Sequence, residues 1–498
     1  MELSALQSLY VIAPYLFGSL TYCYISLRNR HKLPLPPGPK GIPILGNLFQ
    51  LPQKHEWEVY HNWCNDLGTD ILHLNIAGTP LIILDSLEAT TTILDKNSTL
   101  CSDRPRMPMV RELMGWDAAF QFKDHGDEWR EHRKLFHQEM SIGSQRFHLH
   151  QIRATQRFMK RLMYASNGAN VVQEVRDLAG DIAVSITYGF ERTYETQHYA
   201  GLSSIALDPL IEALTPGGSF LVDSFPLLKY IPAWLPGGAF KRKARFWNDL
   251  RVQMFDEAFE DAKSNIMTGN ASPCFVSCSL GQMNQATGDS DDQERRIKAV
   301  AGSIYADVAK RAQREMDDVL GFGILPRFED EGRLPFTKSL IMEMQRWRDP
   351  NPLDLPHVST DELVYKGYRI PKGSVILGNA WGILQNPEIF RDPHIFKADR
   401  YLTPDGQSID KRVLNPSTVI FGYGHRACPG RFVSEASTWI ILSSLIAAFN
   451  FHHVDETGHK HHPFQAGLLR LPNEFKVRFE PRSENFKKLI DGFEDAYW

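Results

Sequence analysis

The chain has 498 residues, of which 43% are hydrophobic and 23% charged, a balance typical of a globular protein with a large core. Its formal net charge of −4 gives no electrostatic reason to expect nucleic acid as a partner. The six cysteines are scattered and include no CxxC pair, which argues against a disulfide framework and fits a reducing compartment.

The first predicted element is the apolar segment from Leu3 to Leu27, which is long enough to cross a membrane once as a helix. Basic residues at 28–32 follow it and only Glu2 precedes it, so the positive-inside rule places the rest of the chain in the cytosol. We therefore expect residues 1–32 to form a membrane anchor with a basic flank. A cleaved signal peptide is the alternative, but its basic residues would lie on the wrong side of the apolar run.

Residues 33–41 contain closely spaced prolines, which predict a stiff, extended hinge. Residues 42–498 are expected to form one body, in which 270–294 is polar and predicts an exposed loop. Helical patterns dominate after Ser86, and strand patterns occur only near the two ends of the body, so the predicted fold is mainly α with small β-sheets. The expected strands are Asp70 to Ile76, Pro80 to Leu84, Val364 to Val375 and Glu474 to Phe479.

Two pairs of residues in the helical region are spaced to share one helical face. Trp129 and Arg133 stand four residues apart, and Glu343 and Arg346 stand three apart in the helical run 338–347. Read from the spacing alone, the second pair is also what a weak surface ion pair would look like.

The most informative segment is 421–430, in which Cys428 stands in a glycine-rich loop ahead of the apolar run 439–449. Glycines permit positive φ and a close approach of the backbone to a bulky planar group. Such a loop can hold a thiolate rigidly, and a thiolate on haem iron favours O–O cleavage. A small buried cysteine is the alternative. A dinucleotide-binding loop is excluded because the third glycine of G-x-G-x-x-G is absent.

This segment resembles the haem-binding signature of cytochrome P450, Phe-x-x-Gly-x-Arg-x-Cys-x-Gly. Its fixed positions are filled by Phe421, Gly424, Arg426, Cys428 and Gly430. The chain is similar to this family almost end to end, and segments 222–236 and 421–424 resemble basidiomycete members of the O-methylsterigmatocystin oxidoreductase-like group, to which tryptamine 4-hydroxylases are related. The resemblance implies a cytochrome P450 fold with an N-terminal transmembrane helix.

The resemblance also implies a set of site residues around haem b, with Cys428 as the axial ligand of the iron. The haem propionates would be held by Arg426, Trp129, Arg133 and His357, of which His357 read alone would be an ordinary loop histidine. A charged network of Glu343, Arg346 and Arg400 would brace the proximal side, and such a network is tolerable only if every member is paired. Its segment 396–401 departs from the commonest family form at Ala398, Asp399 and Tyr401.

By the same resemblance, the function would be a monooxygenase that inserts one oxygen atom from O₂ into a lipophilic small molecule. A fungal secondary metabolite or a polycyclic aromatic xenobiotic would be the substrate, and NADPH would supply electrons through cytochrome P450 reductase. The protein would be a single-pass protein of the endoplasmic reticulum membrane with a cytosolic catalytic domain. A haem-binding relative without catalysis and a haem-free membrane scaffold are the alternatives.

One departure concerns the helix that crosses the distal face of the haem in this family. The segment 299–306 resembles the approach to its Asp/Glu-Thr motif, but the chain then continues as 307–320, which resembles a later helix. About two dozen residues, roughly 36 Å of helix, are absent at this point, and no catalytic acid and threonine pair can be identified. A lost exon or splice form, a decayed paralogue and a rebuilt helix are competing explanations, and weak or absent turnover is expected.

A second departure is the segment 348–356, where relatives carry a more apolar stretch. Asp349 and Asp354 would bring carboxylates close to an apolar cavity. Burial of such groups is costly unless they are paired or turned outward.

Overall fold

The structure is a computed structural model, and it describes residues 33–52, 54–142, 144–165, 168–190, 193–214, 220–268, 313–453 and 476–493. The expected anchor at 1–32, the expected loop at 270–294 and the break near 306 and 307 lie outside these ranges. Within them, no helix has the length and apolar character needed to cross a membrane. The prediction of a mainly helical fold with small sheets is confirmed for the described part of the chain.

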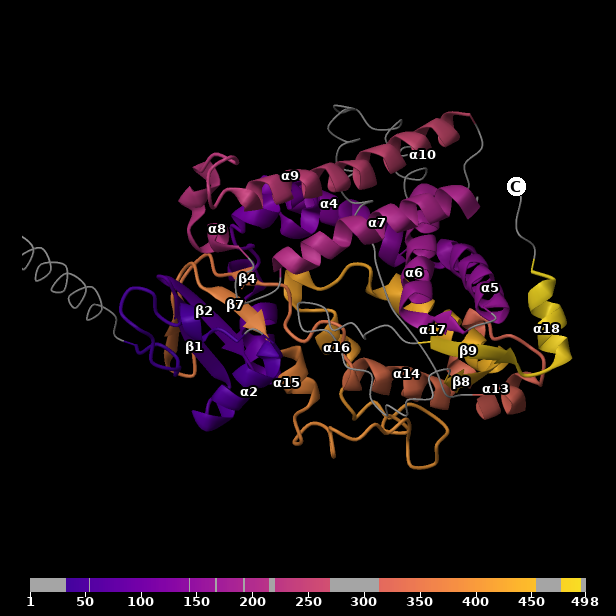
Figure 1. The fold of residues 1–498 in the computed structure, drawn as a ribbon. Helices are drawn as coiled ribbons and strands as arrows, with labels where there is room; N and C mark the ends of the chain where they lie inside the picture. Colours follow the sequence, from indigo (N-terminus) through magenta and orange to yellow (C-terminus); the bar gives the residue numbers. More distant parts are fainter. Residues whose placement is uncertain are drawn as a thin grey trace, which may run out of the picture.

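The largest described sheet has the strand order β1-β2-β7-β4 and lies at one end of the molecule (Figure 1). The two strands predicted from the sequence at 70–76 and 80–84 are present as β1 (Ile71–Ile76) and β2 (Thr79–Leu84), and they pair as an antiparallel hairpin. Leu72, Leu74 and Ile83 pack against helix α2. Strand β7 (Val375–Gly378) joins β2 in parallel, and β4 (His357–Val358) pairs with β7 in antiparallel register. This sheet therefore fixes the backbone of His357.

The strand character expected over 364–375 is confirmed, but it is divided between more than one strand. The chain forms a separate hairpin of β5 (Leu363–Tyr365) and β6 (Tyr368–Ile370), followed by a turn into β7. The reason is the pair Lys366 and Gly367, whose φ angles of 47° and 80° form the tight two-residue turn that reverses an antiparallel pair.

The third described sheet has the order β3-β9-β8 and lies at the far end from β1. It contains β3 (Ala169–Asn170), β8 (Phe449–His453) and β9 (Lys476–Pro481). The strand predicted near residues 474–479 is therefore present as β9, as far as the structure describes that segment.

Helices are the main regular element of the described chain. Their bounds are α2 (Glu56–Asp66), α3 (Leu87–Thr90), α4 (Asp127–His137), α5 (His148–Tyr164), α6 (Val171–Tyr188), α7 (Thr193–Leu214), α8 (Leu221–Ser224), α9 (Ala239–Val252), α10 (Ala258–Met267), α13 (Gln313–Leu320), α14 (Pro335–Trp347), α15 (Ala380–Leu384), α16 (Ser417–Ile420), α17 (Arg431–Ala448) and α18 (Glu484–Asp491).

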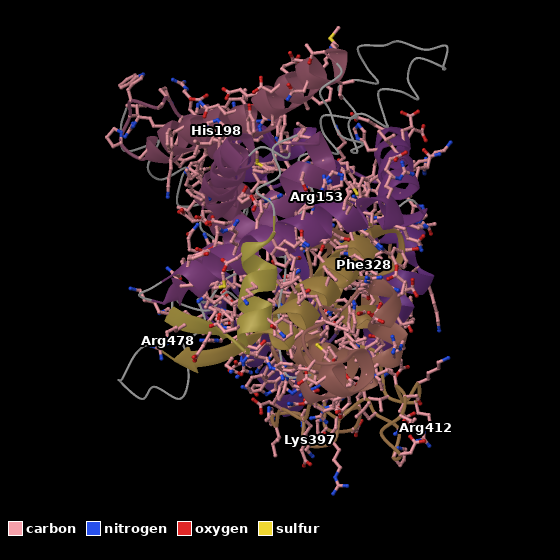
Figure 2. All side chains as sticks on the ribbon, turned by 90° about the vertical axis from the view of Figure 1, so that its right-hand side faces the viewer. Arg153, His198, Phe328, Lys397, Arg412 and Arg478 are labelled. Carbon is pink, nitrogen blue, oxygen red and sulfur yellow. The ribbon has the colours of Figure 1, made fainter. Side chains whose placement is uncertain are left out.

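Helix α17 is the central element of the core. It lies between α5 and α6 on one side and α14 on the other (Figure 1), and it packs against α5, α13 and α14. Its apolar run is buried on every face from Ser437 to Ala448, which is typical of a helix inside a large protein. The long segment between α15 and α16 extends away from the helical body, and Figure 2 shows its Lys397 and Arg412 at the end opposite His198 of α7.

Candidate functional site

The cysteine loop, residues 421–430, connects α16 to α17 and is held in one conformation by its own backbone. The N–H of Cys428 donates to the carbonyl of Phe421 at 2.7 Å, which closes the loop. Gly424 has a φ of 52°, and a Cβ atom there would lie 2.4 Å from the carbonyl oxygen of Leu94. Only glycine fits this position, so the loop packs closely on its neighbours and presents Cys428 just before α17.

Cys428 is a free cysteine and is exposed, whereas the described cysteines Cys64 and Cys101 are buried. Protein atoms around the Cys428 sulfur remove solvent and raise the pKa of its thiol, while a hydrogen bond from the Gly430 backbone and the charge of Arg133 act in the opposite direction. A thiol binds metal only as the thiolate. The neighbouring cation therefore favours the form that an iron would require.

Helix α4 meets the cysteine loop through the two residues that share one of its faces. The guanidinium of Arg133 donates to the carbonyl of Ala427, the residue before Cys428. The indole of Trp129 is buried, and the guanidinium carbon of Arg426 lies 4.7 Å from its ring centroid. The spacing of Trp129 and Arg133 thus places both side chains against the same loop.

Arg426 is buried, and its guanidinium is only partly paired. Its Nε donates to the carbonyl of Ser102 and its Nη2 to the carbonyl of Lys123, both at 2.6 Å. Its Nη1 has no hydrogen-bond partner among the residues that the structure describes. Burial and the charge of Arg104 lower the pKa of Arg426. A buried cation with a spare donor beside other cations is a position suited to an anionic ligand.

His357 lies on strand β4 and is buried, so reading it as an ordinary loop histidine would be wrong. Its Nδ1 lies 2.6 Å from the carbonyl oxygen of Cys101, which can only accept a hydrogen bond. Burial and the charge of Arg104 lower the pKa of His357 to about 3. The ring is therefore neutral, with its proton on Nδ1 and a lone pair on Nε2.

Arg104 belongs to this group of cations but was not found by sequence reasoning. Its Nη1 donates to the carbonyls of Leu355 at 3.0 Å and Pro356 at 2.7 Å, and its Nε donates to Gln121. These contacts link it to the residues just before His357, about 250 positions away in the chain. No local spacing could have indicated this position.

Glu343, Arg346 and Arg400 form one buried charged network. Glu343 accepts two hydrogen bonds from Arg346, at 2.7 and 2.8 Å, and one from Arg400 at 2.8 Å. Its Oε1 also accepts from the backbone N–H of Lys397 at 2.9 Å. The remaining donors of both arginines reach backbone carbonyls of residues 384, 391, 392 and 395. Because Glu343 and Arg346 have no exposed area, the pair differs from a surface ion pair.

The two aspartates of segment 348–356, which is less apolar than in relatives, are turned inward. Asp349 has no exposed area and Asp354 is 4% exposed. Burial and the charge of Asp349 raise the pKa of Asp354 to about 8, against the opposing charge of Arg104. The chain therefore keeps these carboxyl groups inside the protein instead of directing them to solvent.

The sequence is similar to known proteins over almost its whole length. The family model for cytochrome P450 matches residues 36–307 and 303–479, two segments that meet at residues 303–307. Curated relatives include cytochrome P450 monooxygenase 98 of Postia placenta, 36% identical over 96% of this chain and 97% of the relative. A tryptamine 4-monooxygenase of Psilocybe cyanescens is 34% identical over 94% of this chain and 97% of its own. A cytochrome P450 monooxygenase of Armillaria gallica is 36% identical over 93% and 94%.

These matches cover nearly the whole chain, and the matched relatives are fungal monooxygenases. The family implies a haem with a cysteine thiolate as its ligand, which agrees with an exposed cysteine on a loop that Arg133 of α4 contacts. By its sequence and its mainly helical fold, this chain belongs to the cytochrome P450 family.

Proposed function

We propose that this chain is a haem-thiolate monooxygenase in which Cys428 ligates the haem iron. The observation that supports it most is the position of Cys428: an exposed residue on a loop that is closed by its own backbone and joined to Arg133 of α4. When bound, haem supplies the activation of O₂ and the transfer of one oxygen atom to a lipophilic substrate. The protein's part is to hold the sulfur, bind the propionates and exclude water.

The buried cations fit the carboxylates of haem b. Arg426 has an unpaired Nη1, and Arg133 reaches the cysteine loop from α4. We assign the propionates to Arg426, Arg133, Trp129 and His357, and we add Arg104 because its charge acts on both Arg426 and His357. Since the neutral ring of His357 presents a lone pair at Nε2, this histidine must take up a proton to donate to a propionate.

The role proposed for the network of Glu343, Arg346 and Arg400 is to fix the proximal side. Glu343 and Arg346 belong to α14, and Arg400 lies in the segment that leads toward the cysteine loop. Because every oxygen of Glu343 is bonded to a cation or a backbone N–H, the network resists displacement of α14 relative to this segment.

We place the protein in the endoplasmic reticulum membrane, with residues 1–32 as the anchor and NADPH–cytochrome P450 reductase as the electron donor. Exposed apolar side chains on the described body support a membrane-facing side. They include Leu221, Leu227, Tyr230 and Trp234 in and after α8, and Ile44 and Phe49 near the hinge. Figure 1 shows α8 and the described start of the chain at the same end of the molecule.

A catalytically impaired haem protein is the second candidate, and one observation favours it. The family model matches in two segments that meet at residues 303–307, where the sequence lacks the distal acid and threonine pair.

Reconstitution with reductase and NADPH separates the two candidates. The chain is compared with a variant in which a Gly-x-Asp-Thr helix segment is inserted between Ala306 and Asp307. Product formation from an indole or a polycyclic aromatic by the unaltered chain supports the full monooxygenase. Haem absorbance with turnover only after the insertion supports the impaired form, and the absence of haem absorbance in both proteins overturns the proposal.

A further inference from the structure

Asp354 is a buried carboxyl group beside the candidate haem site that the proposed function does not use. Its side chain is 4% exposed, and its Oδ2 has no hydrogen-bond partner within the described ranges. Its backbone N–H donates to the carbonyl of Gly378 at 3.0 Å, and a Cβ atom on Gly378 would lie 2.4 Å from Oδ2. The carboxyl group is therefore packed against the bare backbone of β7.

The cation that acts on Asp354 is Arg104. Arg104 donates to the carbonyls of Leu355 and Pro356, the two residues that follow Asp354, and to Gln121. All of these acceptors are backbone oxygens, so within the described structure these hydrogen bonds join the guanidinium to the residues next to Asp354 and not to the Asp354 carboxylate. Its charge remains available to a second anion.

Two other titratable groups face Asp354. Asp349 is buried and opposes its ionisation, and Tyr423 comes from the cysteine loop. The ring of Tyr423 and the methyl group of Thr90 both lie 3.4 Å from the Cβ position on Gly378. Burial and the carboxylate of Asp349 therefore oppose ionisation of Asp354, whereas the positive charge of Arg104 favours it.

We propose that Asp354 takes up a proton when a haem propionate engages Arg104, so that haem binding by this chain is coupled to protonation of Asp354. The inference rests on the proposed function. A propionate adds negative charge beside Arg104 and neutralises the cation that supports the carboxylate. Asp354 acts through Arg104 and is a positioning residue.

The direction of the coupling follows from the charge states. Burial and Asp349 raise the pKa of Asp354 to about 8 before haem binds, and the propionate raises it further. Below about pH 7 Asp354 is protonated both with and without haem, so it causes no change of haem affinity with pH. Above about pH 8 the haem complex holds a proton that the haem-free protein has lost. Haem affinity then falls as the pH rises, by up to roughly tenfold per pH unit.

Hemin titrations of the full chain from about pH 6.5 to about pH 9.5 test this coupling. The dissociation constant of the unaltered protein is divided by that of Asp354→Asn, so that pH effects of other groups cancel. The ratio should be constant below about pH 7 and rise on the order of tenfold from about pH 8 to about pH 9. Glu56→Gln is the matched control, because Glu56 is a buried carboxyl whose pKa is raised by burial and which is not coupled to Arg104. A constant ratio for Asp354→Asn across the range overturns the proposal.

A second measurement does not depend on the variant folding. Hemin dimethyl ester lacks the propionate charges, so the unaltered protein should lose affinity above about pH 8 more steeply for hemin than for the ester. Parallel pH curves for the two porphyrins overturn the coupling. If the hemin complex shows thiolate-type absorbance but the two pH curves are parallel, the coupling is wrong and the proposed function stands. If hemin gives no thiolate-type absorbance, the proposed function is wrong as well.

Discussion

The guanidinium of Arg133 donates to the carbonyl oxygen of Ala427, the residue that precedes Cys428. One contact therefore connects α4 to the loop that carries the candidate iron ligand. Arg133 is largely buried and its pKa is lowered by burial, while the charge of Cys428 acts in the opposite direction. The same side chain thus orients the loop and favours the thiolate.

Replacement of Arg133 by leucine is expected to weaken hemin binding. The change removes a charge-assisted hydrogen bond to the loop and a cation near the sulfur, a loss of about 1.5–3 kcal/mol, or roughly 10- to 100-fold in the dissociation constant. Absorbance titration measures it. Arg130→Leu is the control, since Arg130 is exposed on the same helix and forms an ion pair with exposed Asp127 in the described structure. Equal affinities for the two variants would contradict the role of Arg133.

Glu343→Gln is expected to destabilise the protein by about 3–5 kcal/mol, because it leaves two buried arginines without their carboxylate. Urea unfolding of the haem-free chain measures the loss. Lys338→Gln, which breaks an exposed pair with Glu331 near the same helix, should cost at most about 1 kcal/mol. A similar small loss for Glu343→Gln would show that the network does not brace α14.

The pH dependence of stability should reveal His357. Its pKa is lowered to about 3 in the folded protein, against about 6.5 for an unperturbed histidine. Between these values the unfolded chain binds a proton that the folded chain does not, so stability falls as the pH falls, by about 1.4 kcal/mol per pH unit. Urea unfolding at about pH 7.5 and about pH 5 measures this loss of stability. In His357→Asn the difference in unfolding free energy between the two pH values should be smaller by this amount. His198→Asn, an exposed histidine of α7, should retain the full difference.

Tyr401→Phe is expected to leave stability unchanged or raise it by about 1 kcal/mol, because the buried Tyr401 hydroxyl has no hydrogen-bond partner in the described structure. Thermal unfolding measures the change. Tyr365→Phe is the contrasting variant: its hydroxyl donates to Asp70 at 2.7 Å, and its loss should cost about 1 kcal/mol. A larger loss for Tyr401→Phe would indicate a bonded hydroxyl.

The sequence predicted those parts of the site that are encoded by short spacings. Trp129 and Arg133 share a face because of helical geometry, and the strand patterns at 70–76 and 80–84 predicted β1 and β2. The loop around Cys428 was recognisable because its glycines and cysteine are adjacent in sequence. Each of these features depends on residues that are close together in the sequence, so a short sequence pattern is enough to predict it.

Other parts depend on contacts that no local pattern contains. Arg104 reaches Leu355 and Pro356 across about 250 residues, and no local motif indicates its role. The inward position of Asp354 depends on Gly378, whose missing side chain makes room for the carboxyl group. The strand pattern over 364–375 did not locate the turn at Lys366 and Gly367, because β-forming residues stand on both sides of it.

The most direct test of the central claim is the absorbance of the reduced, CO-treated protein for Cys428→Ala and for Cys64→Ala. Cys64 is a buried cysteine of α2, so its replacement controls for loss of a thiol. We predict that the unaltered chain and Cys64→Ala show a thiolate-type haem spectrum and that Cys428→Ala does not. A thiolate-type spectrum that persists in Cys428→Ala would contradict the assignment of Cys428 as the iron ligand.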